Sequence, residues 1–165
     1  MVQILLINPK SPTNVGGVMR AAGCYGVDRV WYTGERYGYA KKFATDTKKR
    51  IDEIPLESLH DLIALKQRNC KLVAVELIDG ATPLPFFEHP EDAVYIFGPE
   101  DGSLKQDVLT HCDDVVYIPT KGCMNLAATV NVVLYDRAAK SSKTDYSREH
   151  ILNNRDTNNR AKRLR

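Results

Sequence analysis

Five short runs of apolar residues, each of strand length, limit most strongly how this chain can fold. They cover residues 2–7, 30–33, 71–75, 93–97 and 114–118. The runs are apolar at nearly every position and do not alternate with polar residues, which predicts strands covered on both faces. Segments of helical character lie between and after them, at residues 15–25, 56–68, 104–110 and 124–139. Strands that alternate with helices predict a doubly wound α/β fold around a mostly parallel sheet.

The composition is that of an ordinary globular domain. Of the 165 residues, 43% are hydrophobic and 27% are charged, and this balance separates the chain from disordered proteins. No apolar run approaches the roughly 18–20 residues that cross a bilayer. The first predicted strand starts at once, without the basic and small-residue features of a signal peptide. We therefore expect a cytoplasmic protein with no membrane segment.

The positive charge is concentrated in two stretches. Residues 137–165 hold nine Lys or Arg against three acidic residues, although the net charge of the whole chain is only +2. The second stretch contributes Arg36, Lys41, Lys42, Lys48, Lys49 and Arg50. Two basic patches on an acidic body predict binding of a polyanion such as RNA, with an ordinary solvated surface as the alternative. Because residues 141–165 are also polar and rich in Asn, we expect a folded domain over 1–140 and a flexible basic tail.

Cysteine and histidine give no sign of a metal site. The four cysteines are scattered without a CxxC motif, and no histidine lies at the spacing of a metal ligand. We expect neither a disulfide framework nor a bound metal.

Three segments that follow predicted strands carry residues unusual for plain connections. In the first, Asn14 can cap a helix, two glycines allow close approach of a ligand to the backbone, and Arg20 can reach a nucleotide. In parallel α/β sheets, ligands bind beyond the carboxyl ends of the strands, where these segments lie. A plain helix cap with a small-residue packing face is the alternative for the first segment alone.

The second and third segments indicate which class of ligand the site binds. Residues 97–104 form a glycine-containing turn in which Glu100 and Asp101 would repel a phosphate. Such a turn suits a ribose or a cationic ligand, and S-adenosylmethionine (SAM) is both. In residues 118–128, Asn125 begins an apolar helix, where an amide needs a hydrogen-bonding partner. The alternatives are a simple type I turn and a simple capping residue.

In this order the three segments resemble the motifs of the SPOUT methyltransferases of the SpoU/TrmH class. The similarity covers residues 2–139, and residues 124–135 look most like the minimal members that methylate the wobble ribose of tRNA. The resemblance implies a fold whose C-terminal part forms a trefoil knot. It also implies a homodimer and SAM as the cofactor.

The resemblance also implies roles for individual residues. Arg20 matches the arginine that helps deprotonate or orient the 2′-hydroxyl, and Asn14 and Asn125 match residues that shape the site around it. The matching cofactor-binding residues are Val75, Glu76, Leu77, Gly98, Glu100, Ile118, Cys123 and Leu126. Two features depart from the class: the 118–125 interval is short, and Cys123 replaces the usual serine.

The sequence therefore predicts a SAM-dependent methyltransferase that acts on a ribose 2′-hydroxyl of tRNA. Ribosomal RNA is the alternative substrate. A non-catalytic RNA-binding module of the same fold and a flavodoxin-like nucleotide-binding protein are the alternative functions.

Overall fold

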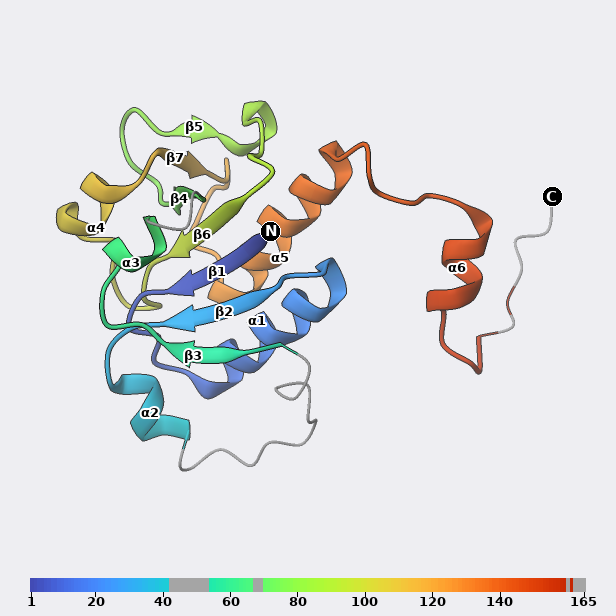
Figure 1. Ribbon diagram of the computed structural model, residues 1–165, viewed down its shortest axis with the longest axis horizontal. Coiled ribbons are helices and arrows are strands. Elements are labelled where there is room, and N and C mark those ends of the chain that lie inside the picture. The colour runs from blue at the N-terminus through green and yellow to red at the C-terminus, as the bar shows by residue number, and fades with distance from the viewer. Residues whose placement is uncertain (42–53, 67–69, 160, 162–165) are drawn as a thin grey trace.

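Parallel strands form one sheet at the centre of the molecule, in the order β3-β2-β1-β6-β4-β7-β5 (Figure 1). The computed structural model describes residues 1–41, 54–66, 70–159 and 161. The strands are β1 (Val2–Leu6), β2 (Arg29–Tyr32), β3 (Leu56–Ser58), β4 (Lys71–Val75), β5 (Thr82–Pro83), β6 (Ala93–Phe97) and β7 (Asp114–Tyr117). The five apolar runs are all strands, which confirms the prediction of a parallel α/β sheet.

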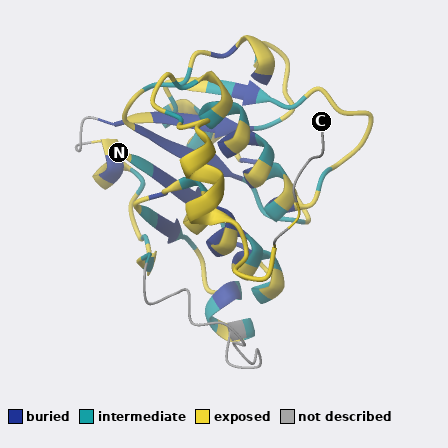
Figure 2. Ribbon diagram, turned by 90° about the vertical axis from the view of Figure 1, so that its right-hand side faces the viewer, coloured by how far each residue is buried: buried dark blue, intermediate teal, exposed yellow. Residues whose placement is uncertain are grey.

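Helices cover both faces of this sheet. The long helices α1 (Pro12–Tyr25) and α5 (Leu126–Lys140) pack against each other on one face. The short helices α3 (Ile63–Lys66) and α4 (Gln106–His111) lie on the other. Every residue of β6, the strand between β1 and β4, is buried (Figure 2). Burial from both sides explains why the strand sequences do not alternate.

Helix α1 starts one turn earlier than the sequence predicts. Ser11 is its N-cap and accepts a hydrogen bond from the backbone N–H of Asn14, while Pro12 occupies the first turn. Proline fits there because its missing N–H has no partner in a helix in any case. Gly26 ends the helix in the left-handed conformation, as predicted. Asn14 is therefore not the cap, and its side chain can bond elsewhere.

The prediction of a helix over residues 56–68 is wrong. Residues 56–58 form edge strand β3 beside β2, and only Ile63–Lys66 are helical among the described residues of this range. The leucines at helical spacing pack on two different faces of the sheet. Leu56 packs with the cluster under α1 and α5, whereas Leu65 is buried in the cluster on the opposite face. Pairing with β2 thus overrides the local helical pattern.

The remaining elements are peripheral. They are α2 (Arg36–Lys41), the 3₁₀ turn η1 (Leu84–Phe86) and α6 (Arg148–Asn154). Helix α6 is exposed along its length and lies apart from the sheet (Figure 1). It belongs to residues 141–165, whose flexibility stays a prediction. Within the part of the chain that the structure describes, no helix is both long and apolar enough to span a membrane.

Candidate functional site

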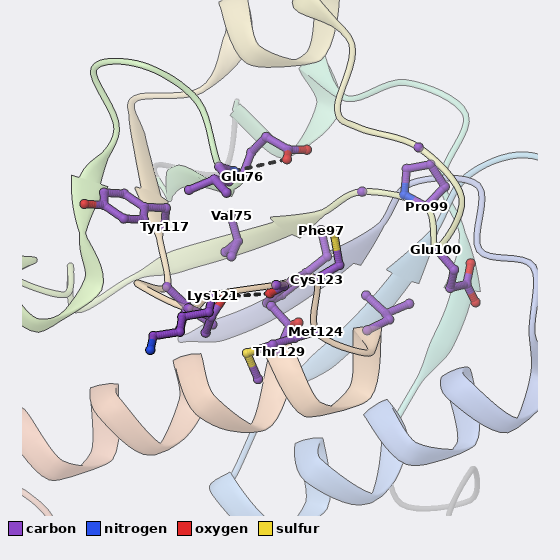
Figure 3. Close-up of a pocket in the computed structure, with 17 residues that line it drawn as sticks. Val75, Glu76, Phe97, Pro99, Glu100, Tyr117, Lys121, Cys123, Met124 and Thr129 are labelled. Carbon is purple, nitrogen blue, oxygen red and sulfur yellow. Dashed lines mark hydrogen bonds between the residues drawn. The ribbon is translucent and has the colours of Figure 1, made fainter.

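A cavity of about 350 Å³ opens at the carboxyl ends of β4, β6 and β7 (Figure 3). Its walls come from the segments that follow these three strands and from the start of α5. The eight residues predicted to bind the cofactor all line it: Val75, Glu76, Leu77, Gly98, Glu100, Ile118, Cys123 and Leu126. The cavity falls within the roughly 300–1,000 Å³ range of small-molecule sites. The structure thus brings together residues from three separate segments of the sequence.

Sequence reasoning missed other residues of the same cavity. Tyr117 and Lys121 lie at one end of it, and Glu100 lies at the opposite end (Figure 3). Thr129 lines it from α5, one turn beyond Asn125. Tyr117 directly precedes the segment 118–128 and Lys121 lies within it, so their place in the sequence could have identified them.

The Glu76 carboxylate faces the backbone of a neighbouring loop. Its Oε2 accepts a hydrogen bond of 2.8 Å from the backbone N–H of Leu104, at the end of the turn that follows β6. Its Oε1 accepts one of 3.1 Å from the N–H of Leu77. Glu76 therefore ties the loop after β4 to the turn after β6.

The Glu100 carboxylate holds the start of α1. It accepts hydrogen bonds from the N–H groups of Lys10 (2.9 Å) and Ser11 (3.0 Å) and from Nδ2 of Asn14 (3.0 Å). Partial burial by itself raises the pKa of this carboxyl, but the three hydrogen bonds outweigh burial and leave the pKa below its ordinary value. Glu100 is thus held as a carboxylate that links the second motif to the first.

Asn14 and Asn125 complete a chain of hydrogen bonds across the three motifs. Nδ2 of Asn125 donates to Oδ1 of Asn14 at 2.8 Å. Oδ1 of Asn125 in turn accepts hydrogen bonds from the N–H groups of Ala127 and Ala128, so Asn125 caps α5. The three sequence segments are therefore one hydrogen-bonded unit in which Asn14 bridges Glu100 and Asn125.

None of the three residues predicted to be catalytic, Asn14, Arg20 and Asn125, is among the residues that line the cavity. Arg20 is exposed on α1, and the structure does not place it among the residues that line the cavity of its own chain. Arg20 can therefore play its predicted role only if the RNA substrate or another protein molecule approaches the exposed side of α1.

Of the predicted RNA-binding residues, the structure shows the side-chain contacts of Arg36. Its guanidinium makes two hydrogen bonds of 2.9 Å to the Asp101 carboxylate, and Lys10 approaches the same carboxylate at 3.7 Å. The ion pair lowers the pKa of Asp101 and raises that of Arg36. Lys42, Lys48, Lys49 and Arg50 and the side chain of Lys41 lie outside the described residues.

A separate buried polar cluster lies toward the C-terminal end of α5. The side chain of His89 is only 4% exposed and contacts the Tyr95 hydroxyl at 2.6 Å and the Asp136 carboxylate at 2.8 Å. Arg137 donates to the Tyr95 hydroxyl, and Lys140 pairs with Asp136 at 2.7 Å. Burial lowers the pKa of His89, and the Asp136 carboxylate only partly offsets this. This cluster attaches the segment that precedes β6 to helix α5.

The described ranges contain no group of three or more His, Cys, Asp or Glu side chains arranged to hold a metal ion. The cavity instead offers backbone groups, carboxylates and apolar walls.

Known proteins are similar to this chain in sequence and in fold. A model of the SpoU rRNA methylase family matches residues 1–135. The tRNA (cytidine-2′-O-)-methyltransferase TrmJ of Methanocaldococcus jannaschii is 27% identical, over 88% of this chain and 71% of its own.

Solved structures agree with this match. The TrmH/SpoU tRNA-modifying enzyme of A. aeolicus superposes with a TM-score of 0.69 at 17% identity, over 92% of this chain and 84% of that one. An AdoMet-bound rRNA methyltransferase from Sinorhizobium meliloti superposes with a TM-score of 0.67 at 19% identity, over 84% of this chain. The match spans 56% of the Sinorhizobium protein. At these identities the two likenesses establish the fold.

Proposed function

The chain belongs to the SpoU rRNA methylase family and is a SAM-dependent RNA methyltransferase, and we propose that it methylates a ribose 2′-hydroxyl of tRNA. The single observation that carries this proposal is that the second and third motifs line one cavity, while Asn14 of the first motif is hydrogen-bonded to both of them. Glu100, Asn14 and Asn125 form a continuous hydrogen-bonded chain beside that cavity. A protein that only bound RNA would not need this combination.

The residues of the cavity fit SAM. Val75, Phe97, Ile118 and Leu126 provide apolar walls for an adenine ring, and the backbone at Gly98 allows close approach. The Glu100 carboxylate at the cavity suits a ligand that carries a ribose and a positively charged sulfonium. When bound, the cofactor supplies the activated methyl group.

The protein's part in the reaction is to align and activate the hydroxyl. A ribose 2′-hydroxyl is a poor nucleophile at neutral pH, so it must be held in line with the methyl group and lose its proton. We assign Arg20 to orient this hydroxyl and assist its deprotonation. Asn14 and Asn125 hold the starts of α1 and α5, and thereby shape the site in which the hydroxyl is placed.

A homodimer is part of the proposal because Arg20 lies outside the cavity of its own chain. In a dimer built on α1 and α5, Arg20 of one copy would border the cavity of the other. Mixing two inactive variants tests this arrangement. One variant is Arg20→Ala, and the other, Gly98→Trp, blocks the cavity. Recovery of activity on mixing supports a shared site, whereas mixed dimers that stay inactive refute it.

The finer features of the family follow as proposals. We infer that the segment after β7 is threaded as a trefoil knot, which would bring the short 118–125 interval against the loops after β4 and β6. We also assign Arg36 and the neighbouring lysines, together with a flexible basic tail over 141–165, to RNA binding in the cytoplasm. Their positive charge favours contacts with phosphates.

The test is transfer of labelled methyl groups from SAM to tRNA from cells that lack this protein. We expect the label in a 2′-O-methylated nucleoside and its loss with Arg20→Ala. Transfer to ribosomal RNA alone would replace tRNA as the substrate. SAM binding without transfer to either RNA would contradict the catalytic assignment and favour a binding module.

A further inference from the structure

The Glu76 carboxylate joins two of the loops that surround the cavity. Glu76 follows β4, whereas Leu104 closes the turn that starts at Gly98 after β6. The 2.8 Å hydrogen bond from the Leu104 N–H to Oε2 of Glu76 connects them (Figure 3 draws Glu76 on the cavity wall). A carboxylate that accepts a backbone N–H makes a charge-assisted hydrogen bond, which is stronger than a bond between neutral groups.

The start of the turn also lies close to this carboxylate. A Cβ atom on Gly98 would lie 3.5 Å from Oε2 of Glu76 and 3.4 Å from the backbone nitrogen of Leu104. The Leu104 side chain is only 6% exposed and packs in the core cluster on the opposite face of the sheet. The turn is therefore held at its Leu104 end twice, by the buried Leu104 side chain and by the hydrogen bond from the Leu104 N–H to Glu76.

Both oxygens of Glu76 are directed to backbone amides. Oε1 accepts from the N–H of Leu77 while Oε2 accepts from that of Leu104. This geometry differs from the sequence-based assignment of Glu76 as a direct ligand of the cofactor.

We propose that Glu76 is a positioning residue: its carboxylate holds the turn from Gly98 to Leu104 in the position that lets the turn contact the adenosine of SAM. The inference rests on the proposed function of the cavity. Glu76 acts as a hydrogen-bond acceptor for the protein backbone, and its negative charge is not what recognises the cofactor.

Two substitutions separate these roles. Glu76→Gln removes the charge and keeps one carbonyl oxygen that can accept from Leu104, while its NH₂ group cannot accept from Leu77. Glu76→Ala removes both acceptors. Asp79→Ala is the matched control, because Asp79 is an exposed carboxylate in the same loop that does not line the cavity. Thermal unfolding establishes that each variant is folded.

The measurements are the affinities for SAM and for its neutral-sulfur product, S-adenosylhomocysteine, and the hydrogen exchange of the Leu104 amide without ligand. We expect Glu76→Ala to weaken both ligands alike, by about tenfold or more, as for loss of a hydrogen bond to a charged group. Asp79→Ala should change either affinity by less than about threefold. Glu76→Gln should weaken both ligands alike and by less than Glu76→Ala does. Exchange at Leu104 should accelerate most in Glu76→Ala and stay unchanged in Asp79→Ala.

Two results would overturn the positioning role. One is a Glu76→Gln variant as weak as Glu76→Ala, with SAM affected more than S-adenosylhomocysteine, because the charge would then contact the sulfonium directly. The other is unchanged exchange at Leu104 in Glu76→Ala. Failure of the wild-type protein to bind SAM is a distinct result, since it overturns the proposed function of the cavity itself.

Discussion

The contact between α1 and α5 at Gly17 leaves no room for a side chain. A Cβ atom on Gly17 would lie 2.8 Å from the Cβ of Ala127. Carbon atoms in favourable contact are about 3.5–4.0 Å apart, so Gly17→Ala must separate the two helices by roughly 1 Å. A Cβ atom on Gly16, the preceding residue of α1, would meet no described atom of another element within 4 Å. Gly16→Ala is therefore the matched control.

The expected magnitudes follow from two opposing effects. Replacing Gly by Ala inside a helix stabilises it by about 1 kcal/mol, which applies to both variants. Overpacking a close contact costs about 1–3 kcal/mol, and this applies to Gly17→Ala alone. We therefore expect Gly16→Ala to be more stable than the wild type. Gly17→Ala should be less stable than Gly16→Ala by about 1–3 kcal/mol.

Urea unfolding at one fixed protein concentration measures this difference, provided that the slope with denaturant is the same for both variants. SAM affinity is a second measurement. It should fall in Gly17→Ala because the 2.8 Å bond between Asn125 and Asn14 joins the same two helices. A Gly17→Ala variant as stable as Gly16→Ala would refute the reasoning, because it would show that α1 and α5 can separate without penalty.

Three further predictions concern other parts of the structure. Because burial holds the pKa of His89 below its ordinary value of 6.5, the folded state binds fewer protons than the unfolded state. The melting temperature should fall as the pH drops below about 6.5, and it should depend less on pH in His89→Gln. A His89→Gln variant whose melting temperature depends on pH as strongly as that of the wild type would contradict this explanation. Asp101→Asn should release Arg36 from its two hydrogen bonds and tighten RNA binding, whereas weaker binding would show that Arg36 acts only within the protein. SAM should slow alkylation of Cys123, which lines the cavity, without slowing that of exposed Cys24 on α1; equal effects at both would argue against SAM in this cavity.

The central strands could be predicted from the sequence because burial on both faces demands apolar residues throughout. The short edge strands could not. β3 has three residues and β5 has two, and neither has a hydrophobic pattern of its own. Their positions depend on pairing with β2 and β7. Leu56 illustrates the difficulty, since its spacing from later leucines fits a helix while its backbone completes the sheet.

The sequence predicted eight residues that meet at the cavity, but not Tyr117, Lys121 and Thr129, and not what each residue contacts. Its motif residues follow neighbouring parallel strands, so the topology itself brings them together. The partners of Glu76 and Glu100 include backbone amides far away along the chain, such as that of Ser11, 89 residues from Glu100. A hydrogen bond to a main-chain group cannot be predicted from the types of the residues. Asn14 shows the same limit, because a cap and a bridging amide look alike in sequence.

The packing of α1 against α5 also determines when the protein can complete its fold. β1 pairs with β6, and α1 packs on a helix that starts at Leu126, so the decisive contacts join distant parts of the chain. Such high contact order predicts slow folding relative to a protein of local contacts. During synthesis, the part of the sheet face that α5 covers stays exposed until α5 has emerged. Exposed apolar surface of this kind favours aggregation, so the nascent chain carries this risk before its cofactor site is complete.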